Sequence, residues 1–266
     1  RSINKLAWHL EEPRVGQSYP NFYAAKLASK FVKVVLSGTG GDELFGGYPW
    51  RYYKAINVQS FEDYIDKYYL YWQRLISNKD LKKLFAPIKN DVKDVWTRDI
   101  FKEVLMMHDN EIKREEDYIN HSLYLEAKTF LHGLFVVEDK LSMAHGLENR
   151  VPFMDNDLVD FAMKCPVKFK LKNFTKTLSI NENMTGNKSD AYVDRTNDGK
   201  NILREIMKKY IPDYIYKAKK QGFSSPDASW FKGESIDFVK DSLLNKNAII
   251  YNYLDREQTE LLINQH

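Results

Sequence analysis

The chain has 266 residues, 43% of them hydrophobic, so it can bury a sizeable core as one large domain or two small ones. Its 40 basic and 37 acidic residues give a formal charge of +3, which argues against nucleic acid or an anionic membrane surface as a partner. The single cysteine cannot form an internal disulfide, and no apolar run approaches the roughly 20 residues that span a bilayer. We therefore expect a cytoplasmic protein.

Two helices and a short strand are expected first. Residues 3–10 have apolar positions at helical spacing, and Pro13 ends this helix because proline disfavours helix in the residue before it. Pro20 can open a second helix, and the apolar residues Val34–Leu36 then predict a buried strand. Three side chains of the second helical stretch are expected to face a core: Phe22, Leu27 and Phe31. Helix followed by strand is typical of half a parallel α/β unit.

A glycine-rich stretch, SGTGGDELFGGY, follows the strand as Ser37 to Tyr48. Gly38, Gly40 and Gly41 allow a sharp turn at the carboxyl end of the strand, where open α/β sheets bind ligands. Backbone N–H groups in such a turn suit an anion, and Asp42 and Glu43 add carboxylates for a divalent cation beside phosphate. The stretch lacks the Lys-Ser/Thr ending of a Walker loop and the spacing of a dinucleotide fingerprint. It predicts a site for metal-bound phosphate, with an ordinary tight connection as the alternative.

Residues 50–72 are rich in aromatic side chains, and residues 61–120 have a helical pattern that is interrupted near Ser77 and Pro87. Aromatic residues interleaved with basic ones can form a platform for single-stranded nucleic acid, but no clear basic groove accompanies them here. We therefore expect these aromatic side chains to pack between helices. The acidic cluster 115–117 is interpreted as a solvated face, because no further ligands accompany it.

The stretch VVEDKLSMAHGLENRVPFMD, residues 136–155, predicts a helix that ends at Gly146 and an extended segment fixed by Pro152. Glu148 and Arg150 form a compact polar pair within it. His145 has a side chain suited to general-base chemistry, but no Ser or Cys nucleophile accompanies it, which favours a structural role. Cys165 lies in an apolar stretch and is expected to be a buried small side chain.

Residues 174–200 are polar and without period, which predicts a long loop of the kind that forms lids or binding loops or is disordered. A helix begins directly after Lys200. A cation at a helix start opposes the usual preference for cations at helix ends. Such a lysine is either functional or an ordinary surface residue, and the spacing alone leaves both readings open.

Several of these stretches resemble the asparagine synthetase family, whose synthetase domain belongs to the ATP-pyrophosphatase superfamily. SGTGGDELFGGY resembles the family signature SGxGxDExFxGY, and residues 139–155 resemble its DRxSMAxxxExRxPFLD stretch. The segments WHLEEP (8–13) and GKNILRE (199–205) also match, the latter where the family places a lysine that stabilises pyrophosphate. The chain departs from the pattern at Lys140 and Ala218, which stand where the family usually has Arg.

The resemblance implies an α/β fold, as a mainly helical fragment that carries part of the parallel sheet of an ATP-pyrophosphatase domain. We expect residues 1–266 to be a partial synthetase domain. Within it, residues 1–56 would be the remnant of the nucleotide-binding α/β core and 57–120 a helical region. Residues 121–266 would be a second helical region with the active-site segments and the loop 174–200.

The resemblance also implies an ATP-dependent amidotransferase that adenylates a carboxylate and then transfers ammonia from glutamine, releasing AMP and pyrophosphate. Asp42 would bind Mg²⁺ between the α- and β-phosphates, and Lys200 would neutralise charge on the leaving pyrophosphate. Glu43 would orient the site. The nucleotide or acyl-adenylate would be held by the start of the glycine-rich stretch: Ser37, Gly38, Gly40 and Gly41.

The β-carboxylate of aspartate is the first expectation for the substrate. Thr39, however, stands where many asparagine-forming relatives carry an acidic residue proposed to assist ammonia attack. Amidation of a sugar carboxylate in polysaccharide synthesis is therefore an alternative, as are lactam formation and a non-catalytic interaction module that keeps the fold.

The family's SGGxDS pyrophosphate loop and its glutaminase domain are not found in these residues. We therefore expect an inactive fragment whose parent chain supplies both parts, with the glutaminase domain as a partner. A homodimer is left open.

Overall fold

The computed structural model describes residues 2–12, 18–52, 57–73, 76–108, 111–172, 198–218, 234–245 and 247–265. Most of the expected loop 174–200 lies outside these residues. The chain divides into two compact units. The first is formed by residues 1–68 and 102–224, and the second by residues 69–101 and 225–266.

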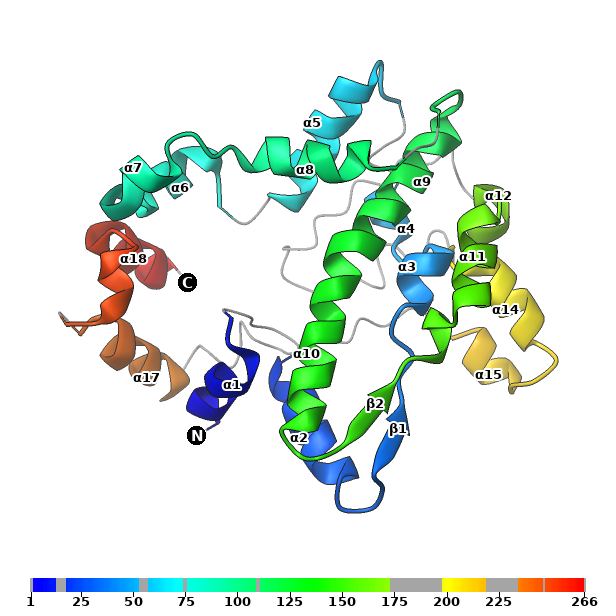
Figure 1. Cartoon of the computed structure of the whole chain (residues 1–266), viewed down its shortest axis with the longest axis horizontal. Coiled ribbons are helices and arrows are strands. Elements are labelled where there is room, and N and C mark those ends of the chain that lie inside the picture. The colour runs from blue at the N-terminus through cyan, green and yellow to red at the C-terminus, as the bar shows by residue number, and fades with distance from the viewer. Residues whose placement is uncertain are drawn as a thin grey trace. The chain divides into compact units, whose positions relative to one another are not determined.

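A two-stranded parallel sheet lies in the first unit beside a long helical run (Figure 1). β1 (Val34–Leu36) pairs with β2 (Glu148–Arg150), with Val35 opposite Asn149. The helical run consists of α9 (Glu115–Leu125), a π-helical turn η3 (Glu126–Phe130) and α10 (Leu131–Met143). Gly146, at φ +63°, follows this run and precedes β2, as the sequence predicts. The prediction of a mainly helical α/β chain with a small parallel sheet is confirmed.

The amino-terminal helices α1 (Ile3–Leu10) and α2 (Ser18–Ala28) pack on α10. Their buried side chains Leu6, Leu10 and Phe22 meet Val137 and Leu141 of α10 in one apolar cluster. The end of α1 is also held electrostatically, because Lys140 Nζ lies 2.9 Å from the Leu10 carbonyl and 2.7 Å from Glu11 Oε2. A cation at the carboxyl end of a helix is stabilising. Lys140 thereby joins the WHLEEP segment to α10.

Two of the predicted core side chains in this region are in fact exposed. Leu27 is 59% exposed and Phe31 is 78% exposed, so the prediction that they face a core is wrong, whereas Phe22 is buried. The buried face of α2 consists of Ser18, Phe22 and Ala25. Leu27 projects from the opposite side at 100° per residue, and the helix ends at Ala28, before Phe31.

The prediction of a buried strand is wrong, and the extended segment predicted with Pro152 is present as β2 but ends before this proline. Val34 is 40% and Leu36 is 74% exposed, and in the described part of the chain β1 pairs with β2 alone. Residues Pro152–Met154 form a 3₁₀ turn, η4, rather than extended chain. Proline at the start of a helical turn loses no hydrogen bond, so the same residue suits either conformation.

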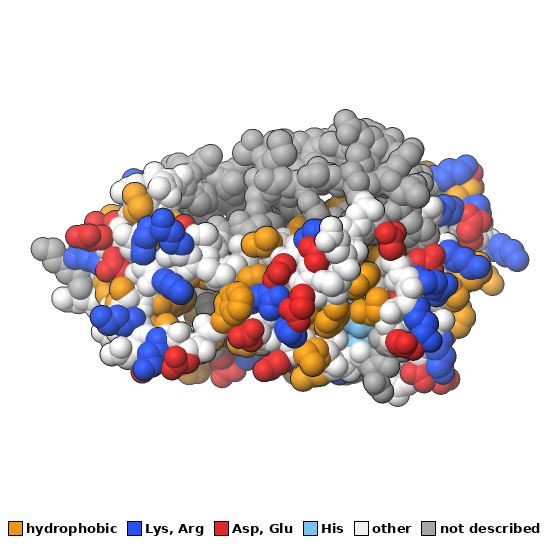
Figure 2. Space-filling model, turned by 90° about the horizontal axis from the view of Figure 1, so that it is seen from above, with side chains coloured by type: hydrophobic (Ala, Val, Ile, Leu, Met, Phe, Trp, Pro, Cys, Tyr) orange, Lys and Arg blue, Asp and Glu red, His pale blue; other side chains and the backbone are white. Residues whose placement is uncertain are grey.

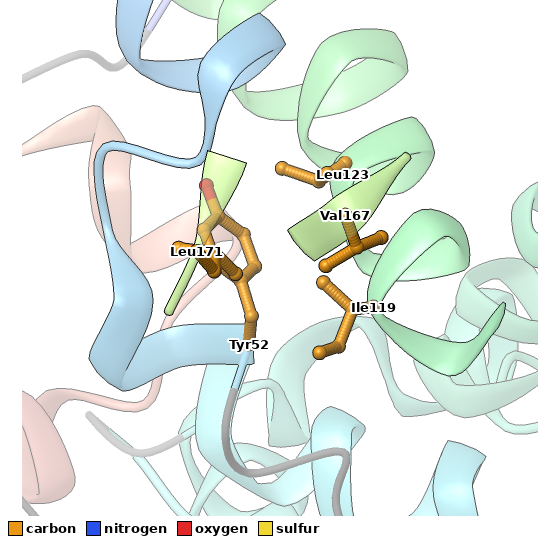
Figure 3. Close-up of a cluster of buried hydrophobic side chains, with 5 residues drawn as sticks. All are labelled: Tyr52, Ile119, Leu123, Val167 and Leu171. Carbon is orange, nitrogen blue, oxygen red and sulfur yellow. The ribbon is translucent and has the colours of Figure 1, made fainter. Parts of the chain in front are cut away.

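Short helices complete the first unit, and one apolar cluster joins two of them to α9. They are α3 (Gly41–Phe45), α4 (Pro49–Tyr52), α11 (Asn156–Lys164), α12 (Val167–Lys170), α14 (Asn201–Met207) and α15 (Asp213–Tyr216). The cluster consists of Tyr52, Ile119, Leu123, Val167 and Leu171 and connects α4, α9 and the end of α12 (Figure 3). Cys165 is buried, as predicted.

The second unit is helical in its described part. It contains α6 (Asn78–Leu84), η2 (Ala86–Ile88), α7 (Lys89–Val92), α17 (Glu234–Leu243), η5 (Ile249–Asn252) and α18 (Arg256–Gln265). α5 (Phe61–Trp72) and α8 (Thr97–Met106) have residues in both units. The predicted break near Ser77 is confirmed, since its hydroxyl accepts the Asp80 N–H and caps α6.

The described tyrosine side chains of α4 and α5 serve helix packing, as predicted. Tyr52, Tyr64 and Tyr68 are fully buried, and Tyr69 and Tyr71 are nearly so.

On the face shown in Figure 2, the coloured acidic and basic side chains are intermingled. None of the helices that the structure describes combines the length and the apolar character needed to cross a bilayer.

Replacing Leu171 by Ala should destabilise the first unit by about 2–5 kcal/mol, because it leaves a cavity in the cluster of Figure 3. Leu27→Ala is a matched control, since the same atoms are removed from an exposed position, and it should change stability by less than about 0.5 kcal/mol. Chemical denaturation measures both. Equal effects of the two substitutions would contradict the assignment of this core.

Candidate active site

The site begins where β1 ends. Ser37 N–H donates to the Arg150 carbonyl at 2.8 Å, which extends the parallel pairing by one residue beyond β1. Gly40 then turns the chain into α3. Its φ of +96° is a backbone conformation that residues with a side chain rarely adopt. The predicted strand, turn and helix are all present. The turn therefore lies at the carboxyl end of a parallel strand, the edge at which α/β sheets bind ligands.

Asp42 and Lys200, far apart in the sequence, form an ion pair at the start of α3. Lys200 Nζ lies 2.7 Å from Asp42 Oδ1, and the two side chains are 26% and 19% exposed. The backbone of Lys200 is left-handed, at φ +53°, and its N–H donates to the Phe45 carbonyl at 3.0 Å. Gly47 packs so close to Asp42 that a Cβ there would overlap the carboxylate. The pair remains partly open to solvent and so accessible to a ligand.

Asp198 builds the turn that presents Lys200. Its Oδ1 accepts hydrogen bonds from Lys172 N–H at 2.9 Å, Gly199 N–H at 2.8 Å and Asn201 Nδ2 at 2.8 Å. Both Asp198 and Asn201 are buried. Charge-assisted hydrogen bonds to backbone N–H groups are among the stronger ones, so this carboxylate fixes the start of α14. The predicted helix start at Lys200 is confirmed.

Glu43 points into the protein rather than toward solvent. It is 2% exposed, and the Tyr48 hydroxyl donates to its Oε1 at 3.3 Å. Burial raises the pKa of Glu43, and the neighbouring charge of Asp42 raises it further. The two carboxylates of the predicted acidic pair thus have different surroundings, and only Asp42 of the two contacts Lys200 in the described structure.

Sequence reasoning missed Glu138, which holds the start of the glycine-rich stretch. Its carboxylate accepts hydrogen bonds from the hydroxyls of Ser37 and Thr39 and from Asn149 Nδ2. Glu138 lies directly before the matched Asp139 in the sequence, but helical spacing does not indicate which acidic residue faces β1. What identifies Glu138 is the register of the two strands, because it sets Asn149 beside Val35 and brings β2 next to the turn.

A second missed feature is a buried polar cluster beneath α3. Glu126, at the start of the π-helical turn, is fully buried and accepts the hydroxyls of Tyr52 at 2.9 Å and Tyr68 at 3.1 Å. Arg51 Nη1 lies 3.6 Å from Glu126, and its guanidinium stacks 3.9 Å from the centre of the Tyr48 ring. Tyr48 in turn donates to Glu43, so this cluster reaches the acidic pair.

Other residues singled out from the sequence lie apart from the Asp42–Lys200 pair. His9 and His145 line a pocket of about 760 Å³ with Trp8 and Lys26, and none of its lining residues belongs to the Ser37–Tyr48 stretch. His145 also stacks on Phe22 with ring centres 4.4 Å apart, in keeping with the structural role expected of it.

Arg204, which also matches the family pattern, donates to the carbonyls of Tyr216 and Ala218 and so ties α14 to the end of α15. Gly38 is exposed, and a Cβ added to it would meet no atom within 4 Å. The segment from Lys219 to Trp230 lies outside the described residues.

The donors fit a magnesium ion that is shared with a phosphate ligand. Among the described residues no group of three His, Cys, Asp or Glu side chains is placed to hold a metal by itself. Mg²⁺ is usually held by one or two carboxylates, substrate phosphates and water rather than by an all-protein cage. A single partly exposed carboxylate, Asp42, beside a cation that suits phosphate, agrees with that arrangement.

Comparison with known proteins identifies the family to which this fold belongs. The model of the asparagine synthase family matches residues 1–266, so the chain belongs to this family, whose domain has the ATP-pyrophosphatase fold. Glutamine-hydrolysing asparagine synthetase 1 of Bacillus subtilis is 27% identical over 280 residues. Its alignment covers 95% of this chain and 40% of the relative.

Two further relatives are matched over a similar share of their length. Glutamine-hydrolysing asparagine synthetase 3 of Bacillus subtilis is 25% identical, covering 98% of this chain and 39% of the relative. The protein named amidase chry2 of Gibberella zeae is 22% identical, covering 86% of this chain and 37% of the relative. The chain therefore spans about two fifths of the length of the curated relatives that it matches.

The burial of Glu126 predicts how the stability of the folded chain depends on pH. Burial raises the pKa of Glu126 to about 7. Between about pH 4.5 and 7 the folded chain keeps a proton that the unfolded chain releases, so this group lowers stability as pH rises, by at most about 1.4 kcal/mol per pH unit. Glu126→Gln removes the titration. Measured by denaturation at pH 5 and 7.5, the stability of the variant relative to wild type should increase with pH.

The matched control is Glu103→Gln, which changes an exposed carboxyl on α8. Its stability relative to wild type should be nearly the same at both pH values. A Glu126→Gln difference that does not change with pH would show that Glu126 is ionised in the folded chain throughout this range.

Proposed function

We propose that this chain is the carboxyl-terminal part of a synthetase that uses ATP to adenylate a carboxylate and then converts it to an amide with ammonia. The observation that carries the proposal is the Asp42–Lys200 ion pair at the carboxyl end of β1. A carboxylate reacts with ammonia only after activation, and adenylation makes the oxygen bound to phosphate a good leaving group. That step requires cationic groups around the phosphates, aimed at the charge that develops as pyrophosphate departs.

Each side chain has a distinct part in this proposal. Lys200 moves from Asp42 to the departing pyrophosphate and neutralises its charge. Asp42 is the protein ligand for Mg²⁺, which when bound neutralises phosphate charge and polarises the phosphorus–oxygen bond. The backbone of Ser37, Gly38, Gly40 and Gly41 contacts the nucleotide, and the buried Glu43 orients α3 from below through Tyr48.

The β-carboxylate of aspartate is the substrate that we propose. The support is membership of the family together with the names of the Bacillus subtilis relatives. The same names support glutamine as the source of ammonia, released by a glutaminase domain outside this chain. We also infer a cytoplasmic location, in keeping with the single, buried cysteine.

We infer that these residues alone do not catalyse the reaction. They span about two fifths of the relatives, and they contain no SGGxDS stretch to hold the pyrophosphate from the other side. The purified 266-residue chain should therefore release no pyrophosphate from ATP with any carboxylate, whereas the full-length protein should. ATP-dependent pyrophosphate release by the short chain would overturn this inference.

In the full-length protein, Lys200→Ala should slow pyrophosphate formation by about 10²–10³-fold, because it removes one cationic group that acts on the leaving charge. The affinity for ATP should change much less. Pyrophosphate release in single turnovers and ATP binding at equilibrium measure the two quantities separately. Asp42→Asn should abolish the same step.

Lys209→Ala is the control for charge, because this lysine is exposed just beyond α14. It should leave both quantities unchanged. A near-normal rate in Lys200→Ala would remove Lys200 from the mechanism and leave its contact with Asp42 as a structural ion pair.

A further inference from the structure

A pocket with basic side chains lies in the first unit, between α1, α2 and the turn that follows α10. Its volume is about 760 Å³, and none of its described lining residues is acidic. Helical spacing explains how α1 and α2 build it. Lys5, Trp8 and His9 are three and four residues apart and so share one face of α1, and Tyr23 and Lys26 share a face of α2 in the same way. The turn adds His145.

Contacts within the lining hold this pocket together. The hydroxyls of Ser2 and Tyr23 are 2.6 Å apart, so a hydrogen bond joins the start of α1 to α2. Phe22 is buried and packs edge-on against Tyr23, with ring centres 5.7 Å apart. The His145 ring lies 4.4 Å from the Phe22 ring on its other contact. The two helices and the turn therefore form one structure around the pocket.

The pocket carries positive charge that the protein itself leaves unbalanced. Lys5 and Lys26 are exposed, and within the described part of the chain neither forms an ion pair with a carboxylate. Burial lowers the pKa of His145, and the neighbouring charges of Lys26, His9 and Lys5 lower it further. Its Nε2 is buried and accepts or donates no hydrogen bond among the described residues. An anion bound here would relieve this repulsion.

This pocket is separate from the candidate active site. His145 precedes β2, so the pocket lies toward the amino end of the strand pair, whereas the turn from Ser37 follows the carboxyl end of β1. Because the two strands are parallel, these are opposite edges of the sheet. A ligand of the pocket is therefore a second ligand, and an inference about it does not depend on the proposed function.

We propose that the pocket binds a phosphate ester that carries a flat ring, with a nucleoside monophosphate as the simplest example. A phosphate group brings nearly two negative charges and three acceptor oxygens at neutral pH, which suits the ammonium groups of Lys5 and Lys26. The ring stacks on Trp8 or Tyr23, whose side chains are 79% and 50% exposed. The volume is that of a small-molecule site and exceeds what phosphate alone would fill.

The test is calorimetric titration of the full-length protein at low salt with uridine 5′-monophosphate, ribose 5-phosphate, inorganic phosphate and uridine. The nucleotide should bind best. Ribose 5-phosphate should bind about 5–100-fold more weakly, because it lacks the stacking ring. Uridine should bind at least about tenfold more weakly, because it lacks the charged group.

Variants locate the binding. The double substitution Lys5→Ala and Lys26→Ala should weaken the nucleotide by at least about tenfold. Trp8→Ala should weaken the nucleotide but not ribose 5-phosphate. Lys30→Ala is the matched control for charge, because this exposed lysine follows α2 and does not line the pocket. Lys200→Ala is the control for the other site. Both controls should bind the nucleotide as wild type does.

Proton uptake gives an independent readout. A bound anion raises the pKa of His145, whose charged neighbours are Lys5 and His9 of α1 and Lys26 of α2. Titration between pH 6 and 7 in buffers of different ionisation enthalpy should therefore show less proton uptake in His145→Gln than in wild type. The ligand's own titration is the same in both proteins and cancels.

Three results would overturn the proposal. One is the absence of saturable binding of any phosphate ester. The second is binding that is lost in Lys200→Ala and kept in the double lysine variant, which would assign the ligand to the Asp42–Lys200 site. The third is an equal loss in Lys30→Ala and the double variant, which would reduce the effect to general surface charge.

Discussion

The parallel pairing of β1 with β2 is the constraint on which the site depends. It joins two segments more than a hundred residues apart in sequence and sets Val35 opposite Asn149. A shift by one residue would turn every side chain of a strand to the other face. In the observed register, Asn149 reaches Glu138, and the Arg150 carbonyl receives the Ser37 N–H that starts the turn. The register therefore positions the turn, the acidic helix α3 and the end of α10 relative to one another.

Electrostatics then divide the site into two parts with different properties. Asp42 has a cation within 2.7 Å, a pair that phosphate and a metal ion can separate because each would replace one partner. Glu43 and Glu126 are buried, and burial raises the pKa of each. The free-energy cost of burying these two carboxylates is offset by the tyrosine hydroxyls that donate to them and by Arg51. The buried carboxylates therefore support α3 from below, whereas Asp42 remains available to a ligand.

The sequence was most informative where local chemistry dictates structure. A short apolar run, three glycines and an acidic pair predict a strand, a turn and a helix start, and the structure has all three. Gly146 and Lys200 likewise mark a helix end and a helix start. The glycines adopt backbone conformations that few other residues adopt, so these turns can be predicted from residue type. The helix start at Lys200 is indicated by the apolar spacing after it, whereas its left-handed backbone is not predictable from a lysine.

Predictions that depend on neighbours distant in the sequence were less successful. Leu27, Phe31, Val34 and Leu36 are apolar and were expected inside, yet their surroundings are set by which elements cover them. Glu138 was missed for the same reason, because nothing in its local sequence distinguishes it from Asp139. Its hydrogen bonds with Ser37, Thr39 and Asn149 exist because the pairing of β1 with β2 brings those residues to α10.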